Sequence, residues 1–241
     1  MGSPARFCFE TARLFIIFAP NKGFDMKKEA LITGATSGIG RATALRLAKE
    51  GYAVTATGRR AERLAALKAE IEAAGGRCTT LVFDVRSEEE VRRNLEPLER
   101  VDLLVNNAGL AAGLEHIDLG DTRDWDAMID TNVKGLLYVT RVIAPKMVAA
   151  GGGHIFNIGS IAGTEAYENG AVYCASKHAV HAISQSMRAD LLSAGIKVTE
   201  IRPGMVETEF SDTVFLIFTC IFQHIFLNLQ HYNRIYRYIT L

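Results

Sequence analysis

The central part of the chain alternates short apolar, β-branched runs with longer amphipathic stretches. From Glu29 to Ile201 this pattern predicts six strands and five helices. The expected strands are 29–33, 53–57, 78–83, 102–106, 154–158 and 197–201. The expected helices are 38–50, 60–74, 87–99, 122–150 and 172–194. This alternation is typical of βαβ units, so we predict an α/β fold with a doubly wound parallel sheet. The ligand crevice is then expected at the carboxyl ends of the strands.

Composition limits the classes of protein that fit this pattern. The chain has 241 residues, 49% of them hydrophobic and 22% charged, which suits one sizeable domain. Its 27 basic and 27 acidic residues balance, so no net field favours nucleic acid or an anionic membrane surface. The cysteines are scattered without a C-x-x-C pair, which favours neither a zinc site nor a disulfide framework. We therefore expect a cytoplasmic protein that does not bind nucleic acid.

The first residues differ from the middle of the chain. Residues 1–25 contain a short apolar stretch that follows Arg6 and Arg13, as in a targeting segment. Glu10 lies between the arginines and the stretch is short, which argues against a secretory signal. We interpret these residues as an N-terminal extension, with Met26 as the natural start.

The last residues also differ in composition. Residues 214–241 form an aromatic tail with no acidic residue. Its apolar part is shorter than the ~20 residues that span a bilayer, so a membrane anchor is not favoured. The expected domain therefore covers residues 26–213.

A glycine-rich turn follows the first predicted strand and leads directly into a helix. Such a turn lets backbone approach a pyrophosphate at the positive end of the helix. Alone, it is equally a tight βα connection, but the strand–turn–helix order favours a nucleotide site. The candidate residues are Gly34, Thr36, Ser37, Gly38, Ile39 and Gly40.

The end of the second strand indicates which dinucleotide is preferred. Sites for NAD usually carry an Asp or Glu there, about 20 residues after the glycines, to bind the ribose 2′-hydroxyl. This chain has Arg59 and Arg60 and no acid at that point. A guanidinium matches a 2′-phosphate in geometry and charge, so we expect NADP, with Arg59 as its ligand. Both arginines could instead begin a solvated helix, and for Arg60 that alternative is favoured.

Two further loops follow strands at the same predicted edge. Asp84 and Val85 follow the third strand, where the carboxylate could accept a hydrogen bond from an adenine or cap the next helix. Asn107, Ala108 and Gly109 follow the fourth strand, with small side chains that would let the loop lie against a cofactor. A structural turn explains the glycine equally well.

The candidate chemistry lies at the start of the last predicted helix. A tyrosine titrates near ~10 and is normally a poor acid-base catalyst. Lys177 lies four residues after Tyr173, on the same helix face, where its ammonium would favour the phenolate. Tyr173 then becomes a usable proton shuttle. Alone, each residue has a structural explanation, and Ser160 alone would be a helix cap. His178 and His181 share a helix face without ligand partners, so a metal site is not favoured.

Together these motifs resemble the short-chain dehydrogenase/reductase family over about residues 28–211. The matching elements are TGATSGIG at 33–40, NNAG at 106–109, Asn132, Ser160, Tyr173-x3-Lys177 and Pro203-Gly204. Segments 56–64, 129–141 and 154–163 look similar to bacterial NADP-dependent 3-hydroxy acid dehydrogenases, the group that includes serine and allo-threonine dehydrogenases. The resemblance implies a Rossmann-type oxidoreductase that moves a hydride between NADP and a small 3-hydroxy acid or related alcohol or carbonyl compound.

The resemblance also implies a role for each matching residue. Tyr173 would exchange a proton with the substrate oxygen, while Lys177 would depress the tyrosine pKa and hold the nicotinamide ribose. Ser160 would hydrogen-bond the substrate oxygen. Asn132 would bind a water that joins Lys177 to solvent. The residues expected to flank the nicotinamide are Pro203, Gly204, Val206 and Thr208.

The resemblance ends before the chain does. Family members continue with a helix that covers the substrate and a seventh strand that often joins an oligomer interface, and nothing similar follows about Asp212. We therefore expect six recognisable strands, with the seventh missing, and the family's usual homodimer or homotetramer is left in doubt. An exposed sheet edge and an incomplete pocket would follow. Two interpretations stay open: an active oxidoreductase, or a truncated, inactive nucleotide-binding remnant or interaction protein.

Overall fold

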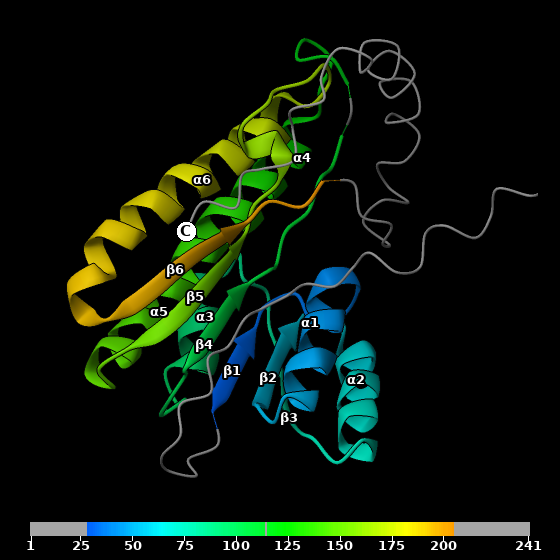
Figure 1. The fold of residues 1–241 in the computed structure, drawn as a ribbon. Coiled ribbons are helices and arrows are strands. Elements are labelled where there is room, and N and C mark those ends of the chain that lie inside the picture. Colours follow the sequence, from blue (N-terminus) through cyan, green and yellow to red (C-terminus); the bar gives the residue numbers. More distant parts are fainter. Residues whose placement is uncertain (1–27, 114, 205–241) are drawn as a thin grey trace, which may run out of the picture.

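The computed structural model describes residues 28–113 and 115–204 (Figure 1). The predictions for residues 1–25 and 214–241, for the seventh strand, and for Val206 and Thr208 lie outside these ranges. Within them the chain forms one six-stranded sheet in the order β3-β2-β1-β4-β5-β6. Every neighbouring pair of strands is parallel, which confirms the predicted doubly wound sheet.

All six predicted strands are present, each within one residue of the expected bounds. They are β1 (Glu29–Ile32), β2 (Ala53–Gly58), β3 (Arg77–Val82), β4 (Leu103–Asn106), β5 (Gly153–Ile158) and β6 (Ile196–Ile201). The helices are α1 (Gly38–Lys49), α2 (Ala61–Ala73), α3 (Glu88–Leu95), α4 (Thr122–Ile129), α5 (Leu136–Ala149) and α6 (Ala171–Leu191). Helix α3 ends earlier than expected because Pro97 follows and disfavours helical geometry at the preceding residue.

Helices cover both faces of the sheet, as Figure 1 shows. On one face, α1 and α2 bury Leu47, Leu64 and Leu67 against Ile32 of β1. On the other, α3, α5 and α6 pack against the alternate side chains of the same strands, such as Leu31. Strands buried on both faces in this way must be apolar throughout, which is the pattern of the sequence.

The expected helix 122–150 is divided into three parts. Helix α4 ends at Ile129, residues Asp130–Gly135 form a π-helical turn, and α5 begins at Leu136. Single π-helical turns inside α-helices are frequent at functional sites. The sequence gives no sign of the turn because its residues have ordinary helical spacing.

A chain of buried amides and hydroxyls joins two strands to two helices. Asn106 Nδ2 donates to Asn157 Oδ1 at 2.9 Å and to Thr140 Oγ1 at 3.0 Å. Asn157 Nδ2 donates to Ser184 Oγ at 2.9 Å, and all four side chains are buried. Asn106 and Asn157 are neighbours in the β4–β5 register, so the chain lies directly below the carboxyl edge of the sheet.

Two absences apply to the described ranges. Within residues 28–113 and 115–204, no helix combines the length and the apolar character that crossing a membrane requires. The same residues contain no group of three or more His, Cys, Asp or Glu placed to hold a metal ion.

Candidate active site

The glycine turn after β1 packs tightly against the loop after β4. Gly34 has a φ of +65°, and a Cβ on it would lie 2.8 Å from Ala108 Cα. A Cβ on Gly40 would lie 2.4 Å from Asn107 Nδ2 and 2.5 Å from the Gly34 oxygen. Both positions therefore require glycine for the two loops to meet, in addition to any approach of backbone to a ligand.

Thr33 and Asn107 hold these loops together through backbone hydrogen bonds. The Thr33 hydroxyl accepts from the Asn107 and Ala108 nitrogens, each at 3.0 Å. Asn107 Nδ2 donates to the Thr33 oxygen at 3.0 Å and to the Gly34 oxygen at 3.1 Å. The Asn107 side chain thus links the two loops by hydrogen bonds. Thr33 was not predicted as a site residue, although it begins the glycine motif.

The N-terminus of α1 is open to an anion. Ser37 occupies the N-cap position but makes no capping hydrogen bond, and the first turn of the helix holds no acidic residue. The free N–H groups and the helix dipole favour a negative charge at such an end. Gly38, with a φ of +52°, turns the backbone into the helix.

Arg60 lies over this turn. Its Nη2 donates to Thr36 Oγ1 at 2.7 Å and to Ser37 Oγ at 2.8 Å, and its Nε donates to Thr36 Oγ1 at 3.1 Å. The sequence favoured a solvated helix start for Arg60. The residue is exposed, but its guanidinium is anchored on the glycine turn. The hydroxyls of Thr36 and Ser37, which follow Gly34 in the sequence, are the signal that would have indicated this anchoring of Arg60.

Arg59 and Asp84 lie side by side at the ends of β2 and β3. Arg59 Nη1 is 3.7 Å from Asp84 Oδ2, and 59% of the arginine side chain is exposed. Burial alone would raise the pKa of Asp84, but hydrogen bonds from Arg86 and the positive charges of Arg86 and Arg59 hold that pKa below its ordinary value. Ser87, not Asp84, caps α3. The next residue, Val85, is buried in the core and packs against Gly135.

Tyr173 enters from the first turn of α6 and forms a hydrogen bond with Ser160. Ser160 also accepts from the Ala162 nitrogen at 3.1 Å, so it caps a short 3-10 helix as well. Burial raises the pKa of Tyr173, the Ser160 hydrogen bond lowers it, and Cys174 raises it. The net direction is upward. The expected depression of the tyrosine pKa is therefore wrong in direction, because burial outweighs the hydrogen bond.

Lys177 lies one turn further along α6 and is buried. Its Nζ donates to the Ile158 oxygen at 2.9 Å and lies 5.9 Å from the centroid of the Tyr173 ring. Burial lowers the pKa of Lys177 to about 8, although Glu200 acts to raise it. The structure confirms that Lys177 and Tyr173 share one helix face, but it assigns the tyrosine's hydrogen bond to Ser160.

Asn132 lies in the π-helical turn and points toward α6. It accepts from the Leu110 nitrogen at 2.8 Å and donates to the Leu110 oxygen at 2.9 Å. Its Nδ2 also donates to Ser176 Oγ at 3.0 Å, and Ser176 donates to the Tyr173 oxygen at 2.7 Å. These bonds fix the loop after Gly109 and the first turn of α6. A Cβ on Gly109 would lie 3.1 Å from Asn132 Oδ1 and 3.7 Å from Lys177 Nζ.

The segment after β6 reaches the Ser160 turn. The Ile161 nitrogen donates to the Pro203 oxygen at 3.2 Å, and the Gly159 nitrogen donates to the Ile201 oxygen at 2.8 Å. Pro203 therefore lies beside the turn that carries Ser160. Gly204 follows, and no heavy atom of the described residues would lie within 4 Å of a Cβ on it.

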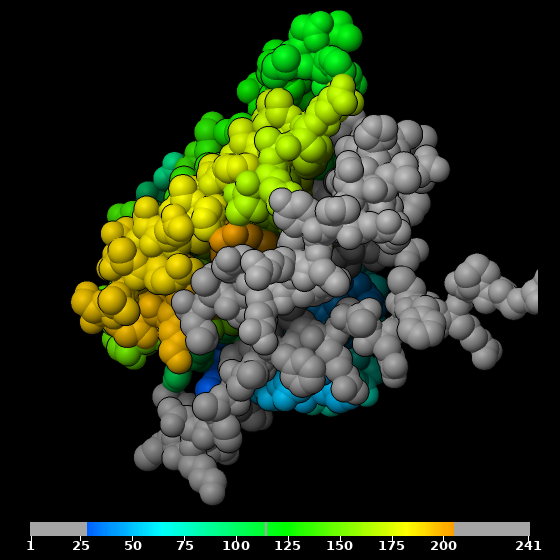
Figure 2. All heavy atoms as spheres, turned by 45° about the horizontal axis from the view of Figure 1, so that its top comes forward, coloured from blue at the N-terminus to red at the C-terminus, as the bar shows by residue number. Residues whose placement is uncertain are grey.

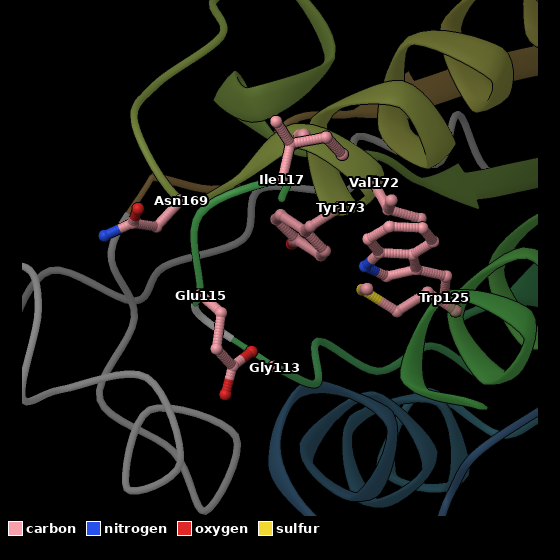
Figure 3. A pocket seen from close by; sticks show the side chains of 9 residues that line it. Gly113, Glu115, Ile117, Trp125, Asn169, Val172 and Tyr173 are labelled. Carbon is pink, nitrogen blue, oxygen red and sulfur yellow. The ribbon is translucent and has the colours of Figure 1, made fainter. Parts of the chain in front are cut away.

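A small pocket opens beside Tyr173 (Figure 3). Figure 3 shows the phenol ring between Trp125 and Val172 on one side and Glu115 and Asn169 on the other. Glu115 Oε2 and Asp124 Oδ2 would lie 2.9 Å and 3.0 Å from a Cβ on Gly113, so two carboxylates flank this loop. The described lining of the pocket contains no basic side chain.

The fold and the site define a dinucleotide-dependent oxidoreductase of the doubly wound α/β class. A family model described as short chain dehydrogenase matches residues 28–216. The chain belongs to the short-chain dehydrogenase/reductase family. It is 48% identical over 190 residues to the NADP-dependent 3-hydroxy acid dehydrogenase YdfG of Salmonella typhi. The matched region covers 77% of this chain and 75% of the relative.

The names of other relatives indicate different substrates. Sulfoacetaldehyde reductase 2 of Chromohalobacter salexigens is 45% identical over 191 residues, with 77% of this chain and 75% of the relative covered. Among solved structures, the closed form of serine dehydrogenase complexed with NADP⁺ has a TM-score of 0.73 and 41% identity, over 85% of this chain and 82% of that chain. These relatives confirm the family and group that the sequence resembles.

Proposed function

We propose that this chain is an NADP-dependent oxidoreductase that moves a hydride between nicotinamide and a small 3-hydroxy acid or a related alcohol or carbonyl compound. The observation that carries the proposal is the half-buried Tyr173, whose hydroxyl is hydrogen-bonded to Ser160 one helical turn from the buried Lys177. The names of the relatives support the cofactor and the substrate class.

The reaction requires a proton at the substrate oxygen and a hydride at its carbon. Bound NADP supplies the hydride chemistry. Tyr173 gives its proton to the carbonyl oxygen in reduction and removes it from the alcohol in oxidation, while Ser160 orients that oxygen. Lys177 restores the tyrosine's proton, with Asn132 binding a water toward solvent.

The residues at the carboxyl edge fit an NADP molecule. The open N-terminus of α1 suits the pyrophosphate, with Gly34, Gly38, Ile39 and Gly40 beneath it. Asp84 and Val85 would meet the adenine, and Asn107, Ala108 and Gly109 would lie along the cofactor. Lys177 and Tyr173 would hold the nicotinamide ribose. Pro203, Gly204, Val206 and Thr208 would flank the nicotinamide.

Arg60 joins Arg59 as a ligand of the 2′-phosphate in this proposal, since it already lies on Thr36 and Ser37. We expect Arg60→Gln to weaken NADPH binding about 10- to 100-fold, the effect of one or two hydrogen bonds to a charged group. NADH binding should change less than about twofold. Fluorescence titration with both cofactors measures this, with Arg93→Gln on α3 as an exposed control. Equal loss of NADH and NADPH binding would contradict the assignment.

The pocket beside Tyr173 bears on the substrate. Its described lining offers Glu115 and no basic side chain, so none of these residues could pair with an acid group of the substrate. NADPH oxidation should therefore be measured with 3-oxo acids, sulfoacetaldehyde and neutral aldehydes of matched chain length. We expect turnover with at least one small carbonyl compound, and with NADPH in preference to NADH.

The second interpretation is an inactive nucleotide-binding remnant or interaction protein. The relatives extend beyond the matched region, since 75% of the first relative is covered. NADPH binding without turnover of any of these compounds would favour the remnant. A homodimer or homotetramer, as the family suggests, would be tested by light scattering of the purified protein.

A further inference from the structure

Glu200 is a buried carboxylate that the proposed mechanism does not use. It lies near the end of β6, and only 4% of its side chain is exposed. Its Oε2 is 2.7 Å from His181 Nδ1 and accepts from Arg202 Nε at 3.0 Å. Its Oε1 is buried and has no hydrogen-bond partner among the described residues. A buried carboxylate oxygen without a partner is costly, so a nearby positive charge is expected to compensate.

The unpartnered oxygen lies against the turn that carries the active-site groups. A Cβ on Gly159 would lie 2.4 Å from Glu200 Oε1, so the carboxylate contacts the backbone of this turn. Gly159 separates Ser160 from Ile158, whose backbone oxygen accepts a hydrogen bond from the Lys177 ammonium at 2.9 Å. Glu200 Oε1 thus lies against the residue that directly follows the hydrogen-bond acceptor of Lys177. Figure 2 shows the yellow surface of α6, which carries Lys177 and His181, beside the orange atoms of β6.

We propose that Glu200 is a positioning residue whose negative charge keeps Lys177 protonated and seated on the Ile158 oxygen. The inference rests on the proposed function, in which the Lys177 ammonium holds the cofactor ribose. The charge effects agree with the geometry: burial lowers the pKa of Lys177 to about 8, and Glu200 is the group that acts against this. Without Glu200, Lys177 would lose its proton nearer neutral pH.

Each element packed around Glu200 contributes to its electrostatic surroundings. From α6 the titratable groups are Lys177, His181 and, through Ser160, Tyr173. From the segment after β6 the charged group is Arg202. The Gly159 turn contributes no titratable side chain. Because His181 and Arg202 both contact Oε2, the other oxygen is left to face the turn.

The test measures NADPH affinity by fluorescence from pH 6.5 to 10. In the wild type, affinity should fall as pH rises through the pKa of Lys177. In Glu200→Gln the ammonium loses a favourable neighbour, so the fall should move to lower pH by about one unit. Glu89→Gln, an exposed carboxylate on α3 with 87% of its side chain exposed, is the matched control and should not move it. An unchanged profile in Glu200→Gln would overturn the proposal.

Two further variants separate charge from folding. Arg202→Gln removes a cation, so the fall in affinity should move to higher pH, by about half a unit. Glu200→Asp keeps the charge and should retain a profile close to that of the wild type. Circular dichroism would show whether Glu200→Gln folds. If it does not, the pH profiles of Arg202→Gln and Glu200→Asp test the proposal instead. A shift to lower pH in Arg202→Gln, or in Glu200→Asp, would contradict the charge effect.

Failure of the proposal about Glu200 can be distinguished from failure of the proposed function. Binding of NADPH needs no substrate, so the pH profile is measurable even if no carbonyl compound is turned over. A wild-type affinity that stays constant from pH 6.5 to 10 would overturn the role of Glu200 and leave the turnover assay open. Absence of turnover with a shifted profile in Glu200→Gln would reject the enzyme and keep the positioning role.

Discussion

Replacing Tyr173 by phenylalanine should reduce kcat about 10²- to 10⁴-fold, the usual effect of removing a general acid or base. The reason is that Tyr173 lines the pocket and carries the hydroxyl that is hydrogen-bonded to Ser160. NADPH affinity should fall by no more than about tenfold, because only one neutral hydrogen bond is lost. Steady-state kinetics with the best substrate and a fluorescence titration measure the two effects.

The control for this variant is Tyr52→Phe. Tyr52 is buried just before β2, at the opposite edge of the sheet, so its loss removes a hydroxyl without touching the site. It should leave kcat within about twofold of the wild type, as expected for a site with no contact to the reaction. Equal rates for Tyr173→Phe and the wild type would remove the case for the tyrosine mechanism.

Replacing Gly40 by alanine should weaken NADPH binding about 10- to 100-fold and lower the melting temperature. The new Cβ would lie 2.4 Å from Asn107 Nδ2 and 2.5 Å from the Gly34 oxygen, so the glycine turn and the β4 loop must separate. Forcing extra volume into a packed site costs about 1–3 kcal/mol. The shift would also displace the open end of α1. Fluorescence titration and thermal melting measure the two losses.

Gly75→Ala is the matched control for stability. Gly75 has a φ of +80° and no atom within 4 Å of a Cβ, so alanine there adds strain of about 1 kcal/mol without a clash. It should lower the melting temperature while NADPH affinity stays unchanged. If Gly40→Ala lost no more affinity than Gly75→Ala, the tight contact between the loops would not matter for the cofactor.

The fold was predictable because its signals are local. Each strand has a continuous apolar run, and glycine or proline marks the ends of several elements, so the strand bounds agree within one residue. The predictions of Ser160, Tyr173 and Lys177 as neighbours depended on collinear motifs. The structure places them on the Ser160 turn and on one helix face.

The remaining features depend on contacts between distant residues. The raised pKa of Tyr173 follows from burial, which spacing along a helix does not reveal. Arg60 differs from Arg59 only in where its guanidinium points. Glu200 is one carboxylate among the 27 acidic residues of the chain, and only its packing in the folded structure brings it against Gly159. Side-chain direction and long-range packing decide such roles.

The linked amides of Asn106 and Asn157 restrict how this protein can change over evolutionary time. Each donates to a partner that must accept, so replacing either one alone leaves an unmatched polar group in the interior. Neutral drift at these two positions should therefore occur in pairs, with intermediates that fold poorly. Variants of the catalytic loops should therefore keep Asn106 and Asn157 and change only residues beyond the carboxyl ends of the strands.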